Sequence, residues 1–133
     1  MTPTLSLGPW DSPAIEFMPR DIEPLVILVM QKHAPLGEET LRSVWSFVTL
    51  DTLHLTDSSI DFFEKLESVC REVMSGRLTQ FDPEQIRGSE FDGYLTRYLG
   101  DGSITSGARV AAERFLAFLS ANPGCWPPRR PAL

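Results

Sequence analysis

The side chains best suited to chemistry in this sequence are carboxylates gathered around one amphipathic stretch. They are Asp51, Asp57, Asp61, Glu64, Glu67 and Glu72. Carboxylates on the outer face of a helix attract a cationic partner, speed its approach and pair with its basic groups. We therefore expect these six side chains to bind a basic protein. The alternative is a solvated helix face, because Lys65 and Arg71 lie in the same stretch at spacings that allow internal ion pairs.

The sequence contains no set of residues with the types and spacing that a catalytic or metal site needs. His33 and His54 are 21 residues apart, and Cys70 and Cys125 are 55 apart, so neither pair has the spacing of a zinc site or a redox motif. Residues 100–103 lack the Gly-Lys-Ser/Thr sequence that gives a phosphate loop its grip. We therefore expect no enzymatic activity, no catalytic residue, no metal and no cofactor.

The charge balance narrows the class of partner. The chain of 133 residues has 12 basic and 18 acidic side chains, a formal charge of −6. Residues 1–76 account for −7 and residues 77–133 for +1. Binding to nucleic acid needs clustered Lys and Arg, so it is not expected. A basic protein is the expected partner, and a toxin domain is the most concrete example.

Hydropathy excludes a membrane-spanning segment. The longest apolar run, residues 25–30, is far shorter than the roughly 20 residues that a spanning helix needs. Residues 1–20 lack the basic start and apolar centre of a signal peptide. A cytoplasmic protein that does not bind membranes is the simplest interpretation.

Five stretches have the apolar spacing of helices. They are residues 21–33, 38–49, 60–74, 82–100 and 106–121. The third has the clearest stripe, whereas Gly88 and Gly93 weaken the fourth. The β-branched residues in the first stretch leave a buried strand as its alternative. No alternating strand pattern is present, so we expect an all-α, single-domain bundle of about five helices.

Proline divides the chain into three parts. Four prolines in residues 1–20 prevent a long helix and indicate an extended N-terminal arm. The helical domain then covers residues 21–121. Residues 122–133 contain four prolines and two arginines, and form a tail that Trp126 could anchor.

One segment also resembles a known family. Residues 55–67, Leu-Thr-Asp-Ser-Ser-Ile-Asp-Phe-Phe-Glu-Lys-Leu-Glu, resemble the start of the second helix in acyl carrier proteins. In this alignment Leu55 matches the family's leucine, Ser59 its modified serine and Glu64 the acid one turn later. The similarity extends over residues 21–99. It implies an acyl-carrier-like bundle with additional helices, and phosphopantetheine on Ser59.

The same residues allow two other interpretations. The Asp-Ser pair of the family is matched by Asp57 and Ser58 instead, and carrier-like domains without a usable serine are equally similar. Helix capping accounts for the same residues without a cofactor, because Ser58 followed by Asp61 approximates a capping box. Two functions therefore stay open. The first is a non-catalytic binding module, such as an immunity protein or antitoxin that occludes a basic toxin domain, and the second is an acyl or peptidyl carrier protein with phosphopantetheine on Ser59 or Ser58.

Overall fold

Helices and a small sheet together form the fold. The computed structural model describes residues 3–9, 11–49, 52–82 and 103–127. Within these ranges it has four helices and three strands. They are, in chain order, β1 (Thr4–Ser6), β2 (Ala14–Glu16), α1 (Pro19–Lys32), α2 (Glu38–Thr49), β3 (Thr52–His54), α3 (Ile60–Met74) and α5 (Ser106–Ala121).

The three strands correct the expected fold class. They form one mixed sheet in the order β2-β1-β3, in which β1 is antiparallel to β2 and parallel to β3. The expectation of an all-α bundle of about five helices is therefore wrong, and the fold is α+β. Each strand turns one large apolar side chain inward. Because each strand has only three residues, it is too short to produce an alternating pattern in the sequence.

Two extended segments of the N-terminal arm, β1 and β2, pair as an antiparallel hairpin. Leu5 of β1 lies opposite Ile15 of β2 and Leu53 of β3, so the inward side chains of all three strands share one row. All three are buried. Phe17, just after β2, packs on Phe115 of α5 with 6.4 Å between ring centroids. This row joins the sheet to the core of the domain.

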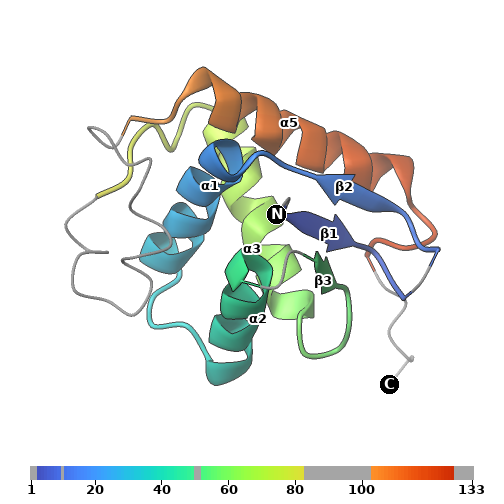
Figure 1. Cartoon of the computed structure of the whole chain (residues 1–133). Coiled ribbons are helices and arrows are strands. Elements are labelled where there is room, and N and C mark those ends of the chain that lie inside the picture. Colours follow the sequence, from blue (N-terminus) through green and yellow to red (C-terminus); the bar gives the residue numbers. More distant parts are fainter. Residues whose placement is uncertain (1–2, 10, 50–51, 83–102, 128–133) are drawn as a thin grey trace.

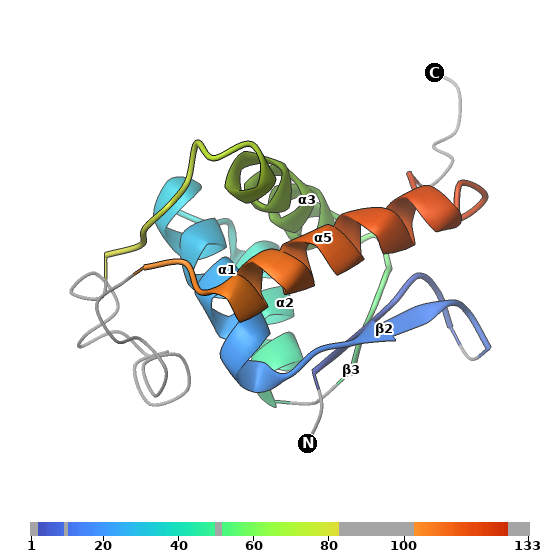
Figure 2. The same cartoon turned by 90° about the horizontal axis from the view of Figure 1, so that it is seen from above.

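Helix α1 runs through the core. Every residue from Ile22 to Val29 is buried, so the β-branched residues that allowed a strand are helical instead. Pro19 stands in the first turn, where a missing N–H breaks no helical hydrogen bond. Figure 1 shows α5 lying across α1, and Figure 2 shows α3 on one side of α5 and β2 on the other.

Three further helices can be compared with the stretches predicted as helical from the sequence. The observed bounds of α2, α3 and α5 agree with the predicted stretches 38–49, 60–74 and 106–121. The predicted helical stretch 82–100 lies outside the described residues, apart from its first residue.

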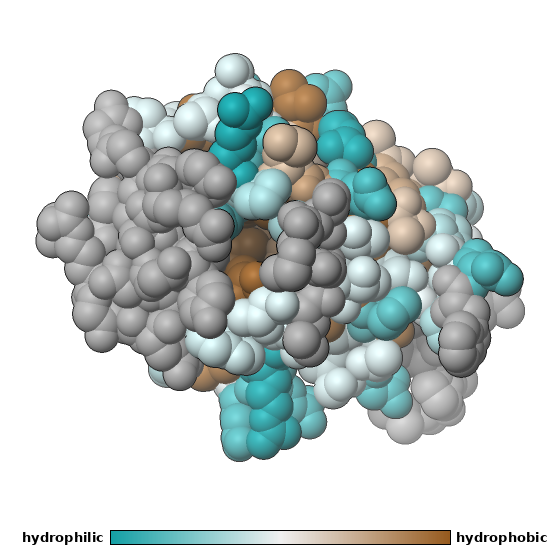
Figure 3. All heavy atoms as spheres, viewed as in Figure 1, coloured by the Kyte–Doolittle hydropathy of each residue, from teal (hydrophilic) through white to brown (hydrophobic). Residues whose placement is uncertain are grey.

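No described helix is long and apolar enough to cross a membrane. The face seen in Figure 3 has hydrophilic residues interrupted by smaller apolar areas.

Candidate functional site

The acidic side chains of α3 have two kinds of neighbour. Asp61 and Glu72 are 11 residues apart, about three turns, and so lie on one side. Glu64 and Glu67 follow at adjacent positions around the helix, next to the C-terminal end of α5. The predicted acidic side chains therefore do not all have the same surroundings. Asp57 precedes the helix on an exposed turn, and Asp51 lies outside the described residues.

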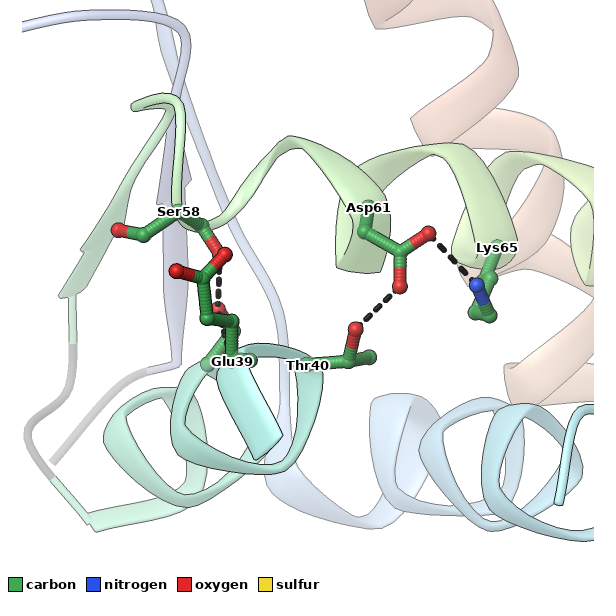
Figure 4. A network of polar contacts seen from close by, with 6 residues as sticks. Glu39, Thr40, Ser58, Asp61 and Lys65 are labelled. Atoms are coloured by element: carbon green, nitrogen blue, oxygen red, sulfur yellow. Dashed lines mark hydrogen bonds and ion pairs between the residues drawn. The ribbon is translucent and has the colours of Figure 1, made fainter. Parts of the chain in front are cut away.

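Asp61 is bound inside the fold. Its carboxylate accepts hydrogen bonds from the hydroxyl of Thr40 on α2 and from Lys65 Nζ, at 2.6 Å, one turn along α3 (Figure 4). Partial burial raises the pKa of Asp61, but the hydrogen bonds from Lys65 and Thr40 outweigh it, and the net pKa is lowered. The carboxylate thus ties the start of α2 to α3.

Glu72 also has an internal partner. Its Oε2 atom lies 2.7 Å from Nζ of Lys32, the last residue of α1. His33 follows directly and faces the same charges. Burial and the neighbouring Lys65 and Lys32 lower its pKa, while Glu72 and Asp61 act in the opposite direction. This side of α3 is therefore a network that joins three helices and not a free acidic surface.

The two serines of the carrier interpretation have different environments. Ser59 is 2% exposed; its hydroxyl donates to His54 O at 2.7 Å and accepts from the Thr56 N–H at 2.8 Å. A buried hydroxyl with its hydrogen in use is not available for attachment unless the turn opens. Ser58 is exposed, and its hydroxyl lies 3.0 Å from that of Thr56.

The predicted capping box is not formed. The residue that caps α3 is Ser59, and its side chain makes no hydrogen bond to the first turn of the helix. Ser58 lies one residue earlier, and the carboxylate of Asp61 is engaged by Thr40 and Lys65. The polar residues before α3 therefore stabilise the preceding turn.

The edge of α3 that carries Glu64 and Glu67 borders a groove that the sequence did not reveal. It has a volume of about 850 Å³ and is open to solvent. We call it the α3–α5 groove. It is lined by Ile60, Glu64, Glu67, Arg71, Leu119, Ser120, Pro123, Trp126 and Pro127.

Trp126 is one of the residues that line this groove. Its indole Nε1 donates to Glu67 Oε2 at 3.1 Å, and its ring packs on Phe63 with 6.0 Å between centroids. Arg71 Nη2 lies 3.3 Å from the same oxygen of Glu67. Trp126 is 7% exposed, so the prediction that it anchors the C-terminal segment is confirmed. The anchored segment lines the groove together with α3 and the end of α5.

The apolar and acidic parts of the groove meet along α3. Leu119 and Trp126 form a buried floor, with half-buried Ile60 beside it. Glu64 is exposed and Glu67 is half-buried along the same edge. An apolar centre with charged groups at its edge is the usual composition of a protein-binding surface.

The residues considered for catalysis lie apart from this groove. His54 is exposed on β3, with Nδ1 2.9 Å from Gly8 O. Cys70 is buried in α3, where burial raises the pKa of its thiol. Among the described residues, no three His, Cys, Asp or Glu side chains are grouped so that they could hold a metal ion. Comparison of the chain with family models, with curated proteins and with solved structures finds no match.

Proposed function

We propose that this protein is a non-catalytic binding module that holds a basic partner protein in the α3–α5 groove. The observation that carries the proposal is the position of Glu64 and Glu67 beside the apolar surface of Ile60, Leu119 and Trp126. A partner could bury an apolar side chain on the floor and place a cationic group at the edge. Contacts of these two kinds supply affinity and specificity, respectively.

The charge of the whole chain favours the same class of partner. A net charge of −6 attracts basic proteins over distances of about a Debye length, roughly 8 Å at physiological salt. The most concrete function of this kind is that of an immunity protein or antitoxin. Such a module blocks a toxin by covering the cationic groups with which the toxin holds its own substrate.

A cytoplasmic location fits this role. Cys70 and Cys125 are both free thiols in the structure. Free thiols persist in a reducing compartment, whereas secreted proteins of this size commonly use disulfides. We include the cytoplasm in the proposal on this ground.

The test is capture of the partner from cells that produce the protein. Tagged wild type, Glu64→Lys and Glu16→Lys are compared; the control reverses the charge of an exposed residue on β2, outside the groove. Wild type and Glu16→Lys should retain the same basic protein. Glu64→Lys should bind it at least tenfold more weakly, about 1.4 kcal/mol.

Two results would contradict different parts of the proposal. If no basic protein is retained, or if all three proteins retain it equally, the groove is not its binding site. If a partner is retained through the groove but its own activity is unchanged by saturating protein, the binding module stands and the immunity role is wrong.

A further inference from the structure

A second hollow adjoins the α3–α5 groove. It has a volume of about 410 Å³ and meets the groove at Ile60, which lines both. It lies between the loop after β1, the turn before α3 and the segment before Trp126. Its lining residues are Leu7, Gly8, Pro9, Leu55, Thr56, Asp57, Ile60, Gly124 and Cys125.

The walls of this hollow are held in place by the sheet and the turn. The Leu55 N–H donates to Ser6 O at 2.7 Å, which extends the contact of β3 with β1. The ring of His54 contacts Gly8 O, and the hydroxyl of Ser59 closes the turn on His54 O. The residues around Asp57 and those around Gly8 therefore form two supported walls.

Together the two hollows form a path along α3 that fits an extended chain. The helix rises by about 16 Å from Ile60 to Arg71. An extended peptide advances about 3.3 Å per residue, so about five residues would span this distance. The hollow beside Asp57 lengthens the path beyond the start of the helix.

The charges along the path are mainly negative. Asp57 is exposed and makes no hydrogen bond or ion pair within the described part of the chain. Glu64 is exposed further along, and Glu67 shares its carboxylate with Arg71 and Trp126. In an extended chain, successive side chains point to opposite faces. Apolar residues could therefore face the floor while the residues between them reach the acidic edge.

Building on the proposed function, we propose that the occupant of this path is an extended segment of the partner, with Lys or Arg alternating with apolar residues. The partner is then recognised by a linear stretch of its chain and not by a folded surface. Charge complementarity with Asp57 and Glu64 selects the cationic positions, and Ile60, Leu119 and Trp126 receive the apolar ones.

The test uses two synthetic peptides of eight residues. One alternates Leu with Arg, and the other alternates Leu with Glu. Each is added to ¹⁵N-labelled full-length protein, and amide chemical shifts are followed by NMR. The Leu-Arg peptide should shift amides around Asp57, Ile60, Glu64 and Trp126, whereas the Leu-Glu peptide should leave them unchanged.

Matched double variants separate specific binding from attraction by net charge. Asp57→Asn with Glu64→Gln removes two charges from the path, and Glu16→Gln with Glu38→Gln removes two exposed charges elsewhere. The first double variant should weaken binding of the Leu-Arg peptide at least tenfold. The second should change it less than twofold. Equal weakening in both would overturn the inference.

Other occupants give different results. If deleting residues 128–133, or diluting the protein, changes the same amides without added peptide, the chain itself or a second copy fills the path, and the inference is wrong. If the captured partner binds through Glu64 but the peptide shifts nothing along the path, the extended segment is wrong while the proposed function stands.

Discussion

Asp61 shows how a carboxylate that is well placed for a partner can serve the fold instead. Helical spacing alone puts it on the solvent side of α3, with the other acids. Its partners are Lys65, one turn away, and Thr40, which only the packing of α2 brings near. A sequence pattern gives the first contact but not the second, because Thr40 lies 21 residues earlier in the chain.

Removing this carboxylate should lower stability. Asp61→Asn loses the ion pair with Lys65 and weakens the bond to Thr40, at a cost of about 1 kcal/mol for partly exposed groups. Asp57→Asn makes the same chemical change on the exposed turn and should cost almost nothing. Urea unfolding at pH 7 measures both, and an equal loss in the two variants would contradict the assigned role.

Acid should remove the same contribution. The folded pKa of Asp61 lies below its ordinary value of 3.8, so its stabilising effect is complete above that pH. It is lost as the pH falls through the folded pKa, because the carboxylate must then be protonated in both states. The difference in unfolding free energy between wild type and Asp61→Asn should therefore shrink below pH 3.8. A constant difference would show that the charge is not responsible.

His33 should make stability depend on pH in a separate range. Its folded pKa lies below 6.5, and its buried Nε2 has no hydrogen-bond partner among the described residues. Below pH 6.5 the unfolded chain therefore takes up a proton before the folded protein does, and stability falls as the pH decreases. Urea unfolding between pH 7.5 and 5 should show this slope in wild type and in His54→Gln, but a smaller one in His33→Gln. Identical slopes in all three would contradict the prediction.

The environment of Ser59 predicts the outcome of a modification assay. Its hydroxyl is buried and donates to His54 O, so a phosphopantetheinyl transferase with coenzyme A should add no mass to it. Intact-mass measurement of wild type, Ser59→Ala and Ser58→Ala tests this directly. If wild type gains the mass of one phosphopantetheine group and only Ser59→Ala abolishes this gain, the result would support the carrier interpretation and contradict this prediction.

At the scale of elements, the start of helix α5 packs against α1 at Gly107, beside the side chain of Asp21. A Cβ on Gly107 would clash with Oδ1 of Asp21 and lie 3.0 Å from its Cγ. The carboxylate of Asp21 thus sits at the N-terminal turn of α5, where the helix dipole favours a negative charge. A Cβ at position 107 therefore fits only if the carboxylate of Asp21 turns away.

Substitution of this glycine should therefore give less than the usual stabilisation by alanine. Alanine normally stabilises a helix by up to about 1 kcal/mol relative to glycine. Gly107→Ala should stabilise the protein by less than this, because the Asp21 carboxylate must turn away from the start of α5. In an Asp21→Ala background the same substitution should give the full stabilisation. Thermal unfolding is measured for wild type, Gly107→Ala, Asp21→Ala and the double variant. If the two substitutions have additive effects on stability, the contact between Gly107 and Asp21 does not matter for stability.

Helices were more predictable than strands for a physical reason. α2, α3 and α5 have 12 to 16 residues, so their apolar stripes repeat several times. β1, β2 and β3 have three residues each, and the pairing of β1 with β3 joins segments almost 50 residues apart. The prolines that argue against helix in the arm are equally compatible with strand ends, such as Pro3 and Pro13 here.

The candidate site was predictable only in part. The spacing of Glu64 and Glu67 placed them on α3, and Trp126 was identified as an anchor. The groove itself needs the end of α5 and the segment from Pro123 to Pro127 to fold back on α3. This return depends on the indole of Trp126 reaching Glu67, 59 residues earlier. No local pattern contains that contact.

At the scale of the molecule, the fold uses its acidic residues for two purposes. Asp61 bonds Thr40 of α2 and Glu72 pairs with Lys32 of α1, so the two carboxylates connect α3 to both helices. Glu64 and Glu67 border the α3–α5 groove, and Glu67 also holds Trp126 and Arg71. We propose that the groove edge serves binding, whereas Asp61 and Glu72 serve stability. Substitution of Glu64 should therefore change affinity while the bonds of Asp61 and Glu72 stay in place.

Site-specific photocrosslinking tests the central claim most directly. A photoreactive amino acid replaces Ser120, which lines the groove, or Val110, which is 53% exposed on the same helix but does not line it. In cells that produce the protein, we expect a crosslink to a basic protein from position 120 and none from position 110. A crosslink from position 110 alone, or none from position 120, would contradict binding through the α3–α5 groove.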